Sequence, residues 1–97
     1  MGTQAFAPET QASGFQGQIP ALEPLLSEVI ATLALAAHAY LADNDGRIPD
    51  FDAAQTAIDV ASVAFERVKE RWRPDERLAI TQMLTETRLT FVRKRGM

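Results

Sequence analysis

The segment DFDAAQTAIDVASVAFERVKERW, residues 50–72, decides the fold of this chain. Its apolar residues recur at alternating steps of four and three, which places them on one face of an α-helix, close to the seam of a coiled coil. These residues are Ala54, Ile58, Ala61, Phe65, Val68 and Trp72. A helix with such a stripe must pack it against other helices, and both neighbouring segments are suited to that role.

The preceding segment predicts a helix over about residues 24–42. Pro24 suits the first helical position, and the residues from 29 to 42 are almost continuously apolar. A transmembrane helix needs about 20 apolar residues. This run is shorter and His38 interrupts it, so we expect a helix buried in a protein and no transmembrane segment.

The segment after Trp72 predicts a third helix, over about residues 74–94. Arg73 precedes a proline, a position that avoids helical angles, and Pro74 then suits the start of a new helix. The predicted fold class is therefore all-α: a small antiparallel three-helix bundle or helical hairpin array that oligomerisation completes. The expected domain spans residues 21–97, with helices at about 24–42, 51–72 and 74–94. The apolar residues of 1–20 recur with neither a helical nor a strand period, so we expect these residues to form a flexible N-terminal arm.

The link between the first two helices resembles part of a calcium-binding loop. If Gly46 takes the sixth position of such a loop, Asp43 and Asp45 stand at ligand positions, but Leu41 stands at the first and offers no oxygen. A glycine turn followed by an aspartate helix cap explains the same residues. We therefore predict no metal site, with cation binding by residues 43–52 left open.

Composition argues against an enzyme. The chain has no cysteine and one histidine, so neither a disulfide nor a Cys/His zinc site can form within it. Ser27 and Ser62 are the serines of the predicted helices. A catalytic serine needs a base within reach, and no motif pairs either serine with His38, the single histidine. Without a glycine-rich phosphate loop, we expect no cofactor and no catalytic residue.

Charge is distributed unevenly along the chain. Residues 1–60 contain eight acids and one base, whereas residues 61–97 contain five acids and nine bases, giving net charges of −7 and +4. A weak nucleic-acid-binding role is the alternative function, and it would use Arg67, Lys69, Arg71, Arg73, Arg77 and the basic C-terminal cluster. Acids are interspersed among these bases and no aromatic residue alternates with them for stacking, so a solvated helix surface is the favoured interpretation.

Three short motifs resemble a known family. Residues 57–59 read Ala-Ile-Asp, residues 74–76 read Pro-Asp-Glu, and residues 88–92 read Arg-Leu-Thr-Phe-Val. In this order, over about residues 26–93, they look like the uncharacterised bacterial domain-of-unknown-function family 1844. The resemblance implies an apolar helix, a loop, a helix with Ile-Asp, a turn and a last helix. That family has no established activity or binding residues, so the resemblance implies no function.

The sequence therefore predicts a non-catalytic interaction or assembly module, a small accessory subunit that self-associates or docks on a larger protein. All three predicted helices have apolar arcs wider than one partner helix covers. We expect a homo-oligomer, with a dimer favoured, or a larger protein partner, in the cytoplasm, because residues 1–17 lack the features of a secretory signal. The residues expected to mediate association are Leu26, Leu33, Tyr40, Ile58, Phe65, Trp72 and Phe91.

Overall fold

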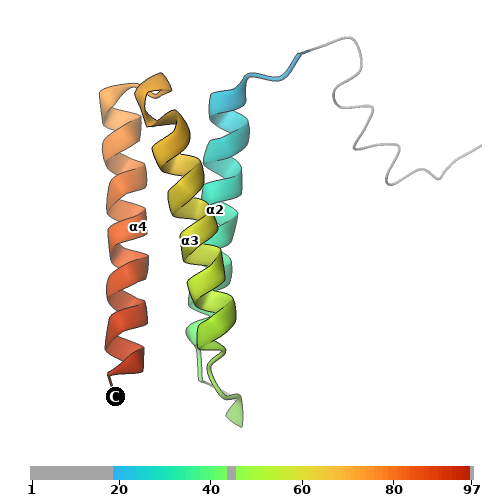
Figure 1. Ribbon diagram of the computed structural model, residues 1–97, viewed down its shortest axis with the longest axis vertical. Coiled ribbons are helices and arrows are strands. Elements are labelled where there is room, and N and C mark those ends of the chain that lie inside the picture. Colours follow the sequence, from blue (N-terminus) through green and yellow to red (C-terminus); the bar gives the residue numbers. More distant parts are fainter. Residues whose placement is uncertain (1–18, 44–45, 97) are drawn as a thin grey trace, which may run out of the picture.

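Three long helices make up the computed structural model of the protein, which describes residues 19–43 and 46–96. They are α2 (Leu22–Leu41), α3 (Phe51–Val68) and α4 (Pro74–Arg95), with a short 3-10 helix η2 (Lys69–Arg71) between the last two. No strand occurs within these residues, so the all-α prediction is confirmed. Figure 1 shows the helices side by side, each antiparallel to the next along the chain. The predicted arm falls almost wholly outside the described residues.

Local chemistry explains where the helices begin. The Oδ1 atom of Asp50 accepts a hydrogen bond from the backbone N–H of Ala53 at 3.0 Å, which caps α3 as expected. At α4, Pro74 is the first residue, and the Glu76 carboxylate accepts from the backbone N–H of Arg73 at 3.4 Å. Gly46 has φ +74°, the left-handed conformation that suits a glycine in the α2–α3 link.

Helix α3 ends at Val68, four residues before the predicted end at Trp72. The chain tightens into η2 and becomes extended at Trp72, with φ −87° and ψ 152°. In a continuous helix, residues seven apart are about 10 Å apart along the axis. The turn instead lets the Trp72 ring stack on Phe65, with centroids 5.7 Å apart.

The core lies where the three helices meet and forms two clusters. One, near the η2 turn, contains Ile30, Ala61, Phe65, Trp72, Ile80 and Leu84. The other, near the α2–α3 link, contains Ala37, Leu41, Ala54, Ala57, Ile58 and Phe91. Helix α2 packs most extensively on α3, and α4 lies along one side of this pair. The opposite side of the α2–α3 pair is therefore left without a covering helix from within the described residues.

Helix α2 is the one helix in the described part of the chain that is long and apolar enough, by length and composition alone, to cross a membrane. A core helix of a water-soluble protein passes the same test, so this finding places no membrane around the chain.

Candidate interaction surface

Four of the seven side chains predicted to mediate association lie in the core of the single chain. Ile58, Phe65, Trp72 and Phe91 are each less than a tenth exposed. Phe65 stacks on Trp72, and Phe91 packs edge-on against Phe51 with ring centroids 5.9 Å apart. The apolar area of these rings is already covered by the protein's own helices.

The other three predicted residues lie on α2 and reach the surface to different extents. Leu26 and Leu33 are half-buried and pack against the core clusters, whereas Tyr40 is 43% exposed. Leu33 and Tyr40 line a groove between α2 and α3, together with small and β-branched side chains of both helices. The structure thus brings these two residues together on one surface.

An apolar surface runs along the α2–α3 pair, on the side away from α4. We call it the α2–α3 face. Helix α4 contacts the other side of the pair, where Phe91 meets Phe51 and Thr87 meets His38. Two adjoining grooves define the face. It comprises Leu25, Val29, Leu33, Ala36 and Tyr40 of α2 with Ala53, Thr56, Ala57 and Val60 of α3.

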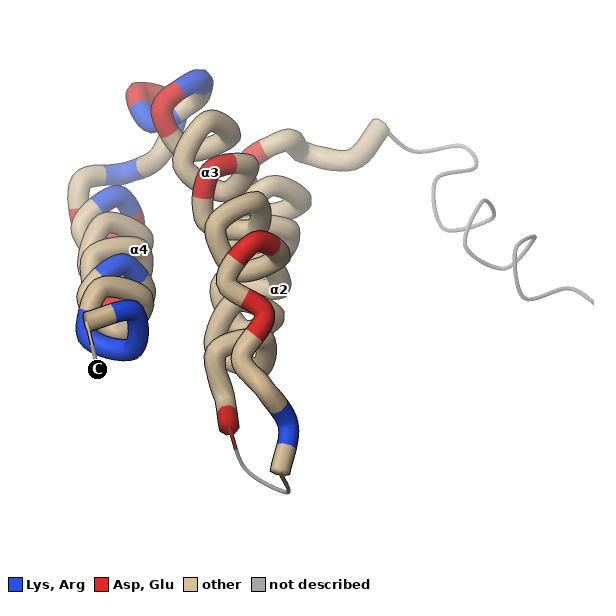
Figure 2. Tube along the Cα trace, turned by 60° about the horizontal axis from the view of Figure 1, so that its bottom comes forward, with Lys and Arg blue, Asp and Glu red and all other residues tan. Residues whose placement is uncertain are grey.

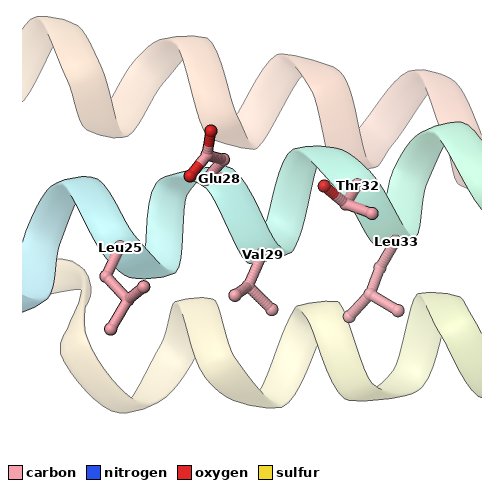
Figure 3. Close-up of a pocket in the computed structure, with 5 residues that line it drawn as sticks. All are labelled: Leu25, Glu28, Val29, Thr32 and Leu33. Atoms are coloured by element: carbon pink, nitrogen blue, oxygen red, sulfur yellow. The ribbon is translucent and has the colours of Figure 1, made fainter. Parts of the chain in front are cut away.

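The side chains of α2 on this face have a consistent orientation. Figure 3 shows Leu25, Val29 and Leu33 in a row directed toward α3, while Glu28 lies on the opposite edge of the helix. Val29 is 40% exposed and Val60, across the groove, is 50% exposed. Neither valine is among the residues expected to mediate association. Val29 lies in the apolar arc of α2, whereas Val60 lies off the apolar stripe of α3. Periodicity does not say which part of a helix surface α4 covers.

Helix α4 carries a second set of exposed apolar side chains. Leu78, Leu89 and Val92 are each more than half exposed. The exposed polar residues Gln82 and Thr85 separate these apolar side chains along the helix. This set does not border either groove that defines the α2–α3 face.

The candidate catalytic groups have structural partners. His38 Nε2 lies 3.2 Å from Thr87 Oγ1, and Thr87 donates its hydroxyl proton to the Met83 carbonyl at 2.9 Å. His38 is therefore the donor to the almost fully buried Thr87. Ser62 accepts a hydrogen bond from Arg88. Within the described residues, the structure does not bring His38 and Ser62 together as a hydrogen-bonded pair.

The proposed cation loop lies partly outside the described residues, which exclude positions 44 and 45. In the part that is described, Asp50 caps α3, and Asp43 lies 3.6 Å from the ammonium group of Lys94. Residues 19–43 and 46–96 contain no group of three or more acidic, histidine or cysteine side chains placed to hold a metal ion. These two aspartates therefore have structural roles as they stand.

Several bases of the second half of the chain are paired with acids. Arg71 lies 2.7 Å from Glu23, and this hydrogen bond holds the pKa of the Glu23 carboxyl below its usual range. Lys69 lies 2.8 Å from Glu66, which raises the pKa of the Lys69 ammonium group. Figure 2 shows acidic and basic positions interleaved around η2 and the start of α4. This mixture differs from the uninterrupted basic stripe that phosphate binding favours.

Comparison with known proteins finds no match: no protein-family model, curated protein or solved structure corresponds to this chain. The resemblance to family 1844 therefore stays a prediction, and any function must be argued from the surface itself.

Proposed function

We propose that this protein is a non-catalytic helical interaction module that docks through the α2–α3 face on another helical protein surface. The observation that carries the proposal is the exposed apolar area on two adjacent helices, centred on Val29 and Val60 and opposite α4. Burying apolar surface is favourable by about 25 cal/mol per Å². A contiguous apolar patch of this kind is typical of protein–protein contact sites.

The shape of the face supports a helical partner. Ala36, Ala53 and Ala57 line the groove, and their small side chains leave room for a ridge of larger residues from another helix. Leu25 and Val29 line the adjoining groove and add larger apolar side chains to the face. Tyr40 at one end combines an aromatic ring with a hydroxyl, a side chain enriched at protein interfaces.

The experiment compares two valines placed on different surfaces. Val60→Glu puts a charge at the centre of the face, and Val92→Glu makes the same change on α4, where Val92 is 64% exposed. Both sites are exposed, so we expect both variants to keep the helical circular dichroism of the wild type. The proposal requires that only Val60→Glu lose association.

Association is measured in two ways: light scattering of the purified protein, and affinity capture from the native host followed by reconstitution with the purified captured protein. A wild-type chain that neither self-associates nor binds a reconstituted protein contradicts the proposal. So does a Val60→Glu variant that associates as the wild type does.

A further inference from the structure

We infer that the α2–α3 face is covered by a second copy of this chain, related by a twofold axis parallel to the helices. The inference rests on the proposed function and names its partner. Helices α2 and α3 of both copies would form a four-helix core, with each α4 on the outside. Glu28 of each copy would then lie against the partner's Arg67.

The first support is a pair of charges without partners in the single chain. Within the described residues, neither Glu28 nor Arg67 makes an ion pair or a side-chain hydrogen bond. Glu28 lies on the edge of α2 that points away from α3, three residues from Leu25 (Figure 3). Arg67 follows Val60 by seven residues, or two helical turns, and so shares its side of α3. The two charges therefore stand at opposite margins of the face.

The second support is that both charges lie at the same end of the helix pair. The backbone N–H of Asp50 bonds to the Tyr40 carbonyl at 2.8 Å, which fixes the register at the linked end. Leu33 and Val60 line one groove further along. Continuing this register, Glu28 stands level with residue 62 of α3, five residues or ~7.5 Å along the axis from Arg67. Extended glutamate and arginine side chains together span this gap.

A twofold axis parallel to the helices keeps each residue at its height along the helix axes. It places the α2 margin of one copy against the α3 margin of the other. It therefore brings Glu28 to the partner's Arg67 and, by symmetry, forms the same pair a second time. A twofold axis perpendicular to the helices would instead carry Arg67 to the opposite end of the partner, where Asp50 and Asp52 lie. The second arrangement also carries Glu28 to the linked end of the partner, where Arg47 lies and already has an interaction within the chain. The first arrangement instead joins two charges that both lack a partner.

The helix directions also fit. Because α2 and α3 are antiparallel within one copy (Figure 1), the parallel axis sets α2 over the partner's α3, again antiparallel. Every helix of the four-helix core then has antiparallel neighbours, which is the arrangement of up-down bundles. This core would bury Val29, Val60 and the exposed side of Tyr40.

The size of the face sets the expected strength. Its length from Leu25 to Tyr40 is about 22 Å at 1.5 Å per residue, and two helices packed 8–10 Å apart make it about 20 Å wide. That corresponds to ~440 Å² on each copy and ~900 Å² in total, the range of weak or transient complexes. We therefore expect a dissociation constant in the micromolar range.

The decisive experiment reverses the two charges separately and together. Glu28→Lys and Arg67→Glu should each raise the dissociation constant of the homodimer by about tenfold, because each places like charges opposite one another twice. An equimolar mixture of the two variants should associate as tightly as the wild type, since both pairs are restored in the heterodimer. The double variant should also regain its homodimer. Glu86→Lys, at an exposed position of α4, is the matched control and should change nothing.

Analytical ultracentrifugation of the full chain and of mixtures labelled with two dyes provides the readout. A wild-type chain that is monomeric at ~200 µM overturns the inference, and so does a dimer in which the mixture is no tighter than either single variant. The proposed function is judged separately. It survives if a monomeric wild-type chain still binds a purified heterologous protein that Val60→Glu does not bind, and it falls if no such protein binds.

Discussion

The indole ring of Trp72 stacks on the ring of Phe65, with centroids 5.7 Å apart and planes inclined by 16°. Both rings are buried, and they close the end of the bundle where the chain turns from α3 into α4. This contact depends on the helix ending at Val68, because in a continuous helix Trp72 would lie about 10 Å along the axis from Phe65. The stack therefore fills the core at this end of the fold.

Removing the indole should destabilise the protein strongly. We expect Trp72→Ala to lower the free energy of unfolding by about 3–5 kcal/mol, because it leaves a cavity next to Phe65 and Ile80. Trp72→Phe should lose less, since a ring remains to stack. Urea denaturation followed by circular dichroism measures both. Leu78→Ala, at a residue 57% exposed, is the control, and a Trp72→Ala loss no larger than that of the control would refute the assigned role.

The His38–Thr87 hydrogen bond should contribute measurably to stability. Thr87→Val keeps the shape of the side chain but removes the hydroxyl that accepts from His38 and donates to Met83. We expect a loss of about 1–2 kcal/mol in the free energy of unfolding, because His38 loses the acceptor for its N–H. Thr85 lies two residues from Thr87, on the exposed side of α4, so Thr85→Val should leave the free energy of unfolding nearly unchanged. Equal stabilities of the two variants would contradict the assignment.

The ion pair between Glu23 and Arg71 should make stability depend on pH. The pKa of Glu23 is lowered from its ordinary value of 4.5, chiefly by the hydrogen bond from Arg71. A group whose pKa is lower in the folded state contributes stability above its unfolded pKa and loses it as the pH falls through the folded pKa. We therefore expect Glu23→Gln to melt at a lower temperature than the wild type at pH 7.

The difference in melting temperature between Glu23→Gln and the wild type should shrink as the pH falls below 4.5. It should vanish once Glu23 is protonated in both the folded and the unfolded state. Thermal melts across this range at low salt provide the measurement. The exposed Glu86, whose side chain forms no ion pair in the described chain, offers the matched Glu86→Gln control. A difference that persists unchanged into acid would count against the pair.

Nucleic-acid binding by the basic half of the chain should be weak. Arg71 and Lys69 already face Glu23 and Glu66, and Asp75 lies 3.7 Å from Arg73. Lys94 likewise lies 3.6 Å from Asp43. Because acids already face these bases, affinity for DNA or RNA should be low at physiological salt. Fluorescence anisotropy at several salt concentrations tests this. Tight binding with a steep salt dependence would favour the alternative function instead.

The sequence by itself determined the secondary structure and most of the core. Steps of four and three residues placed Ile58, Phe65 and their neighbours on one face of α3, and the structure buries them there. Asp50 and Pro74 marked the starts of α3 and α4 because capping and proline geometry depend on a few adjacent residues. Such signals are local, so they can be read without knowing how the helices pack.

Only the tertiary structure decided which apolar residues remain exposed. Val29 and Ile30 both lie in the wide apolar arc of α2, yet one is 40% exposed and the other is fully buried. The difference arises because the other two helices pack against only part of that arc, and nothing within α2 specifies which part. The same packing buries Trp72 and leaves Val29 and Val60 at the surface. A candidate interface could thus be located only after the three helices had been placed relative to one another, since exposure is a property of neighbours distant in sequence.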